Sequence, residues 1–515
     1  MHASITVIIA RPDHHDGYQP SGISRYPIPR SVFPWQQRSG CLSLRDLDAT
    51  ILDTMRTSES APWDTIPSTQ AVLHHPALSS VGLEAGLLAA LVRDAIQQLR
   101  ADPPSTREAA LDAIVARVTR AALAFRLPCR RYINATGIVI HTQWGNAPLS
   151  SAAQQRLLDA TGASPTGARE IGDRAAACEQ LLVALTGAEA ATVTTQNAAS
   201  CLLVAAALAQ GREIVCAARD LIEISHGARL RDILEAGGAR VVPVGAANCV
   251  YPEDYRRAIG PQTAAVMRIH ASNTATTGYT AHVETTALAH IARDARLPLV
   301  VNLGSGSLVD LRDRGLPYAP TIRDALRDGA DLVLASGDKL VGGPQAGVIC
   351  GRRELIERLT RHPVARCCRP GKLTLAALEA TLACYVAGRA WDEVPVLRLL
   401  GASQADLRQR AEALAARAAE ASLGAEATSD TTECGGAALP GILLPTWTVR
   451  LTHPAMACDA LYATLLRHGV VARRRDDAVV LDLRSVLPED DPAIVSALLD
   501  AVAEAASGCT TEVTS

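Results

Sequence analysis

Apolar residues recur at three- and four-residue intervals in two segments near the N-terminus, residues 81–100 and 106–125. This spacing places apolar side chains on one face of a helix, and the intervening ADPPST supplies two prolines and Ser/Thr caps. The pattern therefore predicts a small helical domain within residues 55–130. Residues 1–54 are rich in Pro, Ser and Arg without clear periodicity, and we expect a disordered extension or a start codon assigned too early.

Short apolar runs alternate with amphipathic segments across residues 131–400. We expect helices at segments such as ETTALAHIARDAR and ELIERLTRH, and strands at REIVCA, ARVVPV, AAVMRIH, LPLVVNL, ADLVLAS and AGVIC. Strands interleaved with helices imply parallel βαβ units that are buried on both faces. Ligands of such sheets bind at the carboxyl ends of the strands.

The pattern changes again after residue 400. A long helix is expected at 404–421, followed by a Gly/Thr-rich loop at 422–441 and then by strand, helix, strand and helix. This order predicts a compact α+β domain over residues 401–506, with residues 507–515 as a tail.

Composition adds little to this picture of a soluble globular protein. The chain of 515 residues is 48% hydrophobic, and its net charge of −3 gives no global basic field. A local basic excess lies at the second N-terminal helix, where only Glu108 and Asp112 oppose six arginines: Arg107, Arg117, Arg120, Arg126, Arg130 and Arg131. Such a run fits either a solvated helix face or a nucleic-acid contact.

The 13 cysteines lack CxxC pairs, and no run resembles a set of metal ligands. Reduced thiols are the simplest interpretation, and they favour the cytoplasm. No apolar run reaches the roughly 18 residues that span a bilayer, and the N-terminus lacks the basic region of a signal peptide. The sequence therefore predicts a cytoplasmic protein without a metal site.

Lysine is nearly absent from this chain. Among 50 Lys and Arg residues, only Lys339 and Lys372 are lysines. A guanidinium cannot act as an amine nucleophile, whereas a lysine amine forms Schiff bases. Lys339 follows the predicted strand ADLVLAS, next to Ser336 and a glycine-rich turn. This position suits a Schiff base with pyridoxal phosphate, so Lys339 is the candidate catalytic residue and Ser336 a cofactor contact.

Two further strand or helix ends are candidate contacts of the same cofactor. The turn at Gln196, Asn197 and Ala198 opens a long apolar helix, whose free N–H groups and dipole favour a phosphate. Asn302 ends the strand LPLVVNL, where pyridoxal enzymes usually place a carboxylate against the pyridine nitrogen. The carboxylate keeps the pyridine nitrogen protonated, so that the ring can accept electrons from the substrate. A neutral asparagine weakens this capacity of the ring.

A lone histidine and a basic cluster complete the candidates. His226 is either a structural residue or a ring that stacks on the cofactor or relays protons. Arg366 and Arg369 are three residues apart, one turn if the segment is helical, and Lys372 is one turn further. Such a cluster suits an oxyanion or phosphate, although a solvated surface is the alternative.

Several stretches of the chain, taken together and in this order, resemble the bacterial selenocysteine synthases, which are L-seryl-tRNA(Sec) selenium transferases. They run from Ile66 into the C-terminal domain: IPSTQAVLHHP, INATGIVIHT, TGAEAATVTTQNAAS, LGSGSLVDL, SGDKLVGGPQAG, HPVARCCRPGKLTLAALEATL and VVLDLR. The resemblance implies a fold-type-I pyridoxal-phosphate transferase with a mainly parallel sheet, a helical N-terminal domain and a small α+β C-terminal domain.

The resemblance also implies roles. Lys339 would be the cofactor lysine, Arg366 and Arg369 would bind selenophosphate, and the helical N-terminal domain would hold seryl-tRNA(Sec). The reaction would be β-elimination of the seryl hydroxyl followed by selenide addition, in a homo-oligomer built from dimers.

This chain departs from the family pattern near the predicted site. Asn146 stands where the family has an arginine, Asn302 replaces an aspartate, His226 stands in a glycine-rich position, and residues 246–250 replace a loop that contains threonine and arginine. Two alternatives therefore stay open: a related lyase or β-replacement enzyme acting on a small amino-acid-like substrate, and a protein that binds cofactor or RNA without turnover.

Overall fold

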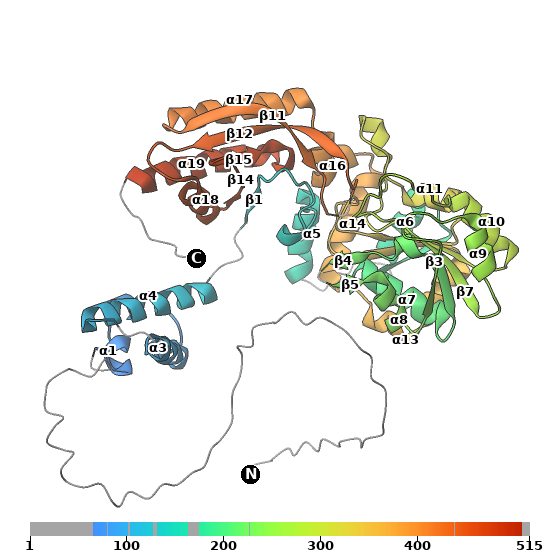
Figure 1. Ribbon diagram of the computed structural model, residues 1–515, viewed down its shortest axis with the longest axis horizontal. Helices are drawn as coiled ribbons and strands as arrows, with labels where there is room; N and C mark the ends of the chain where they lie inside the picture. The colour runs from blue at the N-terminus through green and yellow to red at the C-terminus, as the bar shows by residue number, and fades with distance from the viewer. Residues whose placement is uncertain are drawn as a thin grey trace, which may run out of the picture. The chain divides into compact units, whose positions relative to one another are not determined.

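The computed structural model describes residues 65–79, 81–100, 104–126, 131–162, 175–225, 227–436 and 438–506 (Figure 1). The chain divides into two compact units, Met1–Leu127 and Pro128–Ser515. Each unit has its own apolar core. None of the helices within the described ranges is long and apolar enough to cross a membrane.

The N-terminal unit is helical, as its apolar periodicity predicts. Its helices are α1 (Thr69–Leu73), α2 (Pro76–Ser79), α3 (Ala85–Leu99) and α4 (Arg107–Arg126). The Glu84 carboxylate caps α3 by accepting a hydrogen bond from the N–H of Leu87 at 3.1 Å. Val72, Val92 and Ile114 bury their side chains between the helices, so the unit encloses a core of its own.

A seven-stranded sheet forms the centre of the second unit. In spatial order its strands are β2 (Ala190–Thr194), β10 (Gly347–Gly351), β9 (Leu332–Ser336), β8 (Leu299–Asn302), β7 (Thr263–Ile269), β3 (Glu213–Ala217) and β6 (Arg240–Val244). All of the predicted strands are present, and β2 was missed. The expectation of parallel units is wrong for β10, which pairs antiparallel with β9 and β2 because only a turn, and no helix, connects β9 to β10.

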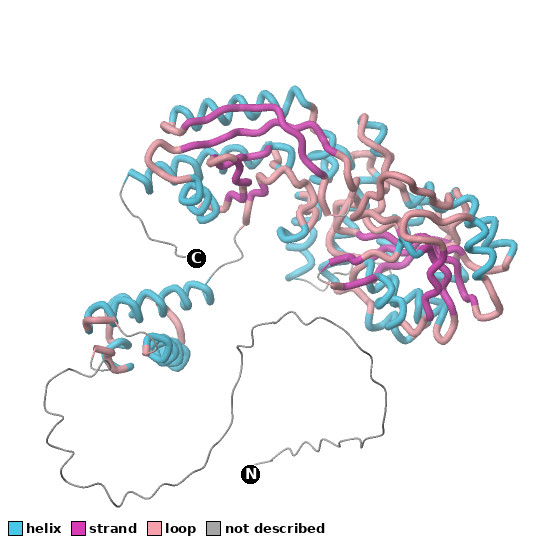
Figure 2. Tube along the Cα trace, viewed as in Figure 1, coloured by secondary structure: helices cyan, strands magenta, loops and turns pink. Residues whose placement is uncertain are grey.

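Helices cover this sheet, and shorter elements connect them (Figure 2). The helices are α5 (Ser151–Gly162), α6 (Ala176–Thr186), α7 (Asn197–Ala209), α8 (Leu230–Ala236), α9 (Pro252–Ala258), α10 (Thr285–Asp294), α11 (Ile322–Arg327), α12 (Arg353–Arg361), α13 (Pro363–Cys367), α14 (Lys372–Val386), α15 (Ala390–Glu393) and α16 (Pro395–Gly401). The shorter elements are 3-10 turns η1 (Thr142–Trp144), η2 (Ala218–Asp220) and η3 (Leu311–Arg314) and the hairpin of β4 (Glu223–Ser225) and β5 (Ala228–Arg229).

Successive side chains of the strands enter different apolar clusters. In β8, Leu299 and Val301 join a cluster with residues of α6, α10, α11 and α14, while Val300 joins one with residues of α7, α8 and α12. This alternation follows from the two-residue period of a strand. The prediction that the strands are buried on both faces is therefore confirmed for six of the strands, whereas the edge strand β6 exposes Arg240 and Pro243.

The C-terminal part of this unit carries a four-stranded antiparallel sheet. Its order is β11 (Gly424–Glu433), β12 (Leu443–Thr452), β15 (Ala478–Asp482) and β14 (Arg473–Arg475), with α17 (Gln404–Glu420), α18 (Cys458–Arg467), α19 (Asp491–Ala506) and the turns η4 (Leu483–Ser485) and η5 (Pro488–Asp490). The predicted loop at 422–441 is wrong, because β11 pairs along its whole length with β12. Strand β1 (Ile133–Asn134) pairs with β13 (Val470–Val471), so the chain that enters the large sheet first contacts this smaller part.

Candidate active site

Lys339 lies on a tight turn that leaves the carboxyl end of β9. The turn is closed by backbone hydrogen bonds from Gly343 N to Gly337 O at 2.8 Å and from Gly342 N to Lys339 O at 2.9 Å. Gly342 has a φ of +71°, and a Cβ there would lie 2.3 Å from Val394. Only glycine fits both constraints. The glycines of this segment thus fix the backbone that presents the lysine.

Burial tunes the two charged groups on this turn. It lowers the pKa of the Lys339 ammonium from its ordinary value, and the neighbouring Asp338 carboxylate opposes that shift. Burial also raises the pKa of Asp338, whose Oδ2 accepts a hydrogen bond from Asn146 Nδ2 at 2.6 Å. A lysine with a lowered pKa is more often neutral, which is the form that attacks a carbonyl.

The start of α7 offers unpaired backbone donors. Gln196 is the N-cap residue in an extended conformation, and its side chain makes no capping hydrogen bond. No described group accepts from the backbone N–H of Asn197 or Ala198. Thr194 Oγ1 lies 2.7 Å from Ser200 Oγ and ties the end of β2 to the first turn of the helix. This geometry suits an anion at the helix start.

Asn302 connects the end of β8 to that same turn. Its buried Oδ1 accepts hydrogen bonds from Asn197 Nδ2 and from the N–H of Gly304, both at 2.9 Å. The N–H of Ser336 in turn donates to the carbonyl of Gly304 at 2.9 Å. The structure therefore brings together three of the predicted positions at neighbouring strand ends, and the turn that carries Lys339 continues from Ser336.

One buried atom in this group lacks a partner. Asn197 Oδ1 is enclosed, and no described residue donates a hydrogen bond to it. Buried polar atoms are almost always paired, so an orphaned acceptor beside free N–H groups is consistent with a ligand that has both acceptors and donors. The described residues therefore fit a small phosphorylated group.

The predicted basic cluster lies beside the same helix start but not on one helix. Arg366 is in α13, Arg369 lies in the connection, and Lys372 begins α14. The carbonyl of Cys368 accepts a hydrogen bond from the N–H of Thr195 at 2.8 Å, which holds this connection against the start of α7. Both arginines are exposed, and neither makes a hydrogen bond or ion pair with another described residue.

His226 lies outside the described residues. Sequence reasoning missed another histidine, His270, which follows β7 and whose backbone N–H donates to the carbonyl of Asn302 at 2.8 Å. Burial and Arg268 lower the pKa of His270 to about 4. It lines a cavity of about 250 Å³ together with Asp220, whose pKa burial raises to about 6. The rule that ligands bind at strand ends would have identified His270.

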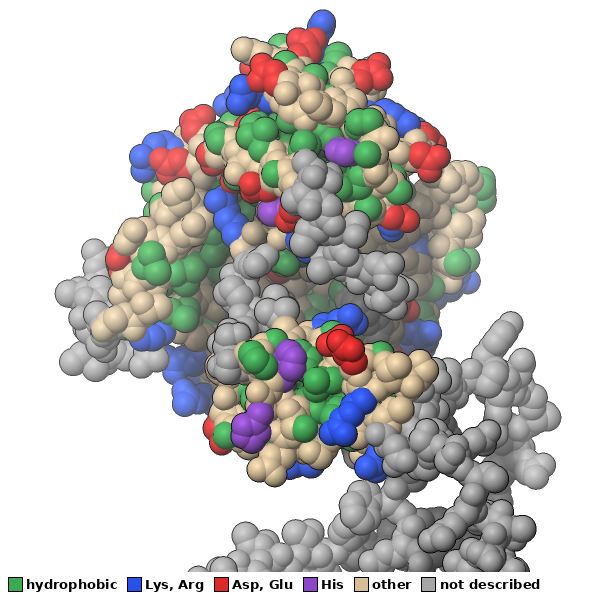
Figure 3. Space-filling model, turned by 90° about the vertical axis from the view of Figure 1, so that its left-hand side faces the viewer, with side chains coloured by type: hydrophobic (Ala, Val, Ile, Leu, Met, Phe, Trp, Pro, Cys, Tyr) green, Lys and Arg blue, Asp and Glu red, His purple; other side chains and the backbone are tan. Residues whose placement is uncertain are grey.

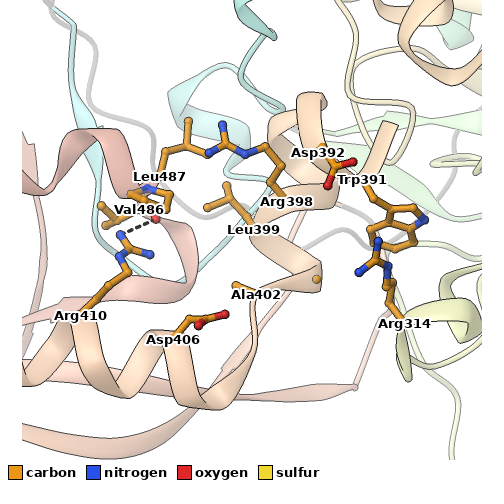
Figure 4. A pocket seen from close by; sticks show the side chains of 12 residues that line it. Arg314, Trp391, Asp392, Arg398, Leu399, Ala402, Asp406, Arg410, Val486 and Leu487 are labelled. Carbon is orange, nitrogen blue, oxygen red and sulfur yellow. Dashed lines mark hydrogen bonds between the residues drawn. The ribbon is translucent and has the colours of Figure 1, made fainter. Parts of the chain in front are cut away.

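A second cavity of about 310 Å³ shares no residue with the Lys339 turn (Figure 4). Two of its three arginines form ion pairs, Arg398 with Glu489 and Arg410 with Asp491, both at 2.7 Å. The third, Arg314, lies over the ring of Trp391 at 5.3 Å from the centroid. On the face shown in Figure 3, acidic and basic side chains are interspersed. Within the described ranges, no group of His, Cys, Asp and Glu is placed to hold a metal ion.

Comparison with known proteins points to one family. The family model described as L-seryl-tRNA selenium transferase matches residues 132–487. The L-seryl-tRNA(Sec) selenium transferase of Geobacter sulfurreducens is 39% identical over 425 residues, covering 79% of this chain and 92% of that protein. The enzyme of the same name from Moorella thermoacetica is 40% identical over 398 residues, covering 75% and 84%.

A solved structure supports the fold. D-Glucosaminate-6-phosphate ammonia-lyase superposes with a TM-score of 0.53 and 22% identity, covering 75% of this chain and 99% of that one. At that identity the similarity concerns the fold alone. The predicted fold class is confirmed.

Proposed function

This chain belongs to the L-seryl-tRNA selenium transferase family, and we propose that it converts L-seryl-tRNA(Sec) to selenocysteinyl-tRNA(Sec) with selenophosphate as the selenium donor. The observation that carries the proposal is Lys339, a half-buried lysine with a lowered pKa on a glycine-fixed turn at the end of β9. Only one other lysine, Lys372, occurs in the chain.

The cofactor that we propose is pyridoxal phosphate on Lys339. Its phosphate would accept hydrogen bonds from the free N–H groups of Asn197 and Ala198 next to Gln196, and its ring would lie against Asn302 and Ser336. When bound, pyridoxal phosphate would withdraw electron density from the seryl Cα and thereby make the proton on Cα acidic. The seryl amine would replace Lys339 at the cofactor carbon, and the released Lys339 Nζ would take that proton, since burial favours its neutral form.

We propose that the exposed side chains of Arg366 and Arg369 bind the selenophosphate anion. We expect Arg366→Ala and Arg369→Ala each to raise the apparent KM for selenophosphate by roughly 10- to 150-fold, because charge-assisted hydrogen bonds would be lost. Cofactor absorbance should stay unchanged, because its phosphate is assigned to the start of α7. Steady-state kinetics with varied selenophosphate measures the effect, and an unaltered KM in both variants would contradict this role.

Substitutions of two arginines in the N-terminal unit test tRNA binding separately from selenophosphate binding. Arg117 and Arg120 are exposed on α4, whereas Arg131, counted in the same basic run, pairs with Asp490. Arg117→Gln with Arg120→Gln should weaken tRNA binding and flatten its salt dependence without changing the KM for selenophosphate. If this double variant leaves tRNA binding unchanged, α4 is a solvated surface.

Asn302→Asp tests the assignment of the cofactor ring. A carboxylate would accept the same hydrogen bonds from Asn197 Nδ2 and Gly304 N, and it would raise the pKa of a ring nitrogen facing it. Nitrogen NMR of the labelled cofactor should show the more protonated ring in Asn302→Asp but not in Asn302→Ala. The same ring-nitrogen signal in the Asp variant and the wild type would mean that Asn302 faces another part of the site.

Cellular setting and assembly are also proposals. Each described cysteine is a free thiol, which supports a reducing compartment, and we propose that the protein works in the cytoplasm as a homo-oligomer built from dimers. Analytical ultracentrifugation of the holoenzyme measures the assembly.

One experiment tests the whole function. The purified holoenzyme is incubated with seryl-tRNA(Sec) and selenophosphate, and separately with a panel of small amino acids, and products are identified by mass spectrometry. Selenocysteinyl-tRNA is the expected product. The neutral Asn146 beside Asp338 favours the alternative, a lyase or β-replacement enzyme. Turnover confined to the small amino acids would establish that alternative.

A further inference from the structure

Two exposed aromatic side chains form a pair on the surface of the second unit. Tyr132 is 39% exposed and Trp144 is 41% exposed, and their ring centroids lie 5.1 Å apart at an interplanar angle of 45°. The ring of His141 lies 6.4 Å from that of Trp144. The neighbouring residues Thr142, Gln143 and Gly145 are exposed too, so the tip of this segment projects from the fold.

This aromatic pair differs from the other aromatic side chains with a described ring contact. An arginine guanidinium lies over each of Tyr318, Trp391, Trp447 and Tyr462, at 4.6 to 5.3 Å from the ring centroid. No described guanidinium lies over Trp144 or Tyr132. The pair therefore offers a π-face that no arginine in the described part of the chain covers.

Hydrogen bonds hold the segment that carries Trp144 close to the turn of Lys339. Asn146 has a φ of +66°, donates from Nδ2 to Asp338 Oδ2 at 2.6 Å, and is followed by Ala147, whose N–H donates to the carbonyl of Asp338 at 3.0 Å. Asp338 is the residue before Lys339. Trp144 is two residues from Asn146, a chain distance of at most about 7 Å. The exposed ring thus lies at the edge of the candidate active site.

We propose that Trp144, supported by Tyr132, stacks on the 3′-terminal adenine of the aminoacyl-tRNA. This inference rests on the proposed function. The seryl group is esterified to the ribose that carries this adenine, so a seryl group at Lys339 brings the base to the edge of the site. Aromatic side chains stack on bases without reading their sequence. Because every tRNA ends in the same adenine, Trp144 positions the ester and does not select tRNA(Sec).

The test uses the holoenzyme and two stable amides. One is 3′-L-serylamino-3′-deoxyadenosine, and the other is L-serine methylamide, which lacks the base. The change in cofactor absorbance on binding gives a dissociation constant for each. Trp144→Ala should weaken binding of the adenosine amide by roughly 5- to 100-fold and leave the methylamide unchanged. Trp144→Phe should keep most of the affinity that Trp144→Ala loses. Tyr318 is an exposed aromatic side chain elsewhere, and Tyr318→Ala should change neither dissociation constant.

Three results would overturn the inference. One is equal affinity of the wild type for the two amides, and another is an equal loss for both in Trp144→Ala, which would indicate a structural role. The third is a changed oligomeric mass in Trp144→Ala by ultracentrifugation, since the pair would then be a contact between copies of this chain. If the tests fail but the wild type turns over seryl-tRNA(Sec), only the stacking role is refuted. If the wild type does not turn over seryl-tRNA(Sec), the proposed function is refuted as well.

Discussion

Replacing Lys339 with arginine is expected to abolish covalent attachment of pyridoxal phosphate and to lower turnover of seryl-tRNA(Sec) by roughly 100- to 10,000-fold. The guanidinium keeps a positive charge but cannot form a Schiff base or take a proton at neutral pH. Borohydride reduction followed by peptide mass spectrometry measures the attachment directly, independently of activity. In the wild type, the label should lie on the peptide that contains Lys339.

The chain offers a matched control in its other lysine. Lys372 begins α14 and is partly exposed, so Lys372→Arg keeps a charge at a helix start and should leave the borohydride label at Lys339 unchanged. A label on the peptide that contains Lys372 would refute the assignment of the cofactor lysine. Loss of the label in both variants would also refute it, because the loss would then reflect general disruption of the site.

The sequence predicted six of the seven strands of the large sheet, because most of them are buried on both faces. The run 332–335 in β9, for example, is continuously apolar, and the Ser and Gly residues of a turn follow it. The position of Lys339 was predictable for a related reason, since it closely follows such a strand and the neighbouring glycines indicate a tight turn. Signals of this kind are local in the chain.

Features that depend on partners distant in sequence were not predictable. Strand β11 (Gly424–Glu433) is largely polar and half exposed, and only its pairing with β12 makes it a strand. The contact between Asn197 and Asn302 joins residues 105 positions apart. Sequence reasoning placed each residue at an element end but could not show that their amides are hydrogen-bonded to each other.

The run VVLDLR illustrates the same limit. It ends in Arg484, which sequence reasoning treated only as part of a family resemblance. In the structure this guanidinium is buried and donates to the carbonyls of Leu399, Leu400 and Ala402 at 2.8 to 3.2 Å, and also to the carbonyl of Pro445. It thereby joins the end of α16 to the smaller sheet. The cationic group also lies at the negative end of that helix, although burial lowers its pKa.

Arg484→Met should therefore lower the free energy of unfolding by about 3 kcal/mol or more, because several buried carbonyls would lose their donor at once. Arg484→Lys should recover only part of this loss, since one ammonium cannot reproduce the planar fork that reaches four carbonyls. Urea unfolding followed by circular dichroism measures both variants. Arg408→Met on α17 is the control: its exposed ion pair with Glu412 and its contact with the Trp447 ring should together contribute less than about 2 kcal/mol. If Arg484→Met unfolds at the same urea concentration as Arg408→Met, the four carbonyls must find other donors, and Arg484 does not hold the joint between α16 and the smaller sheet.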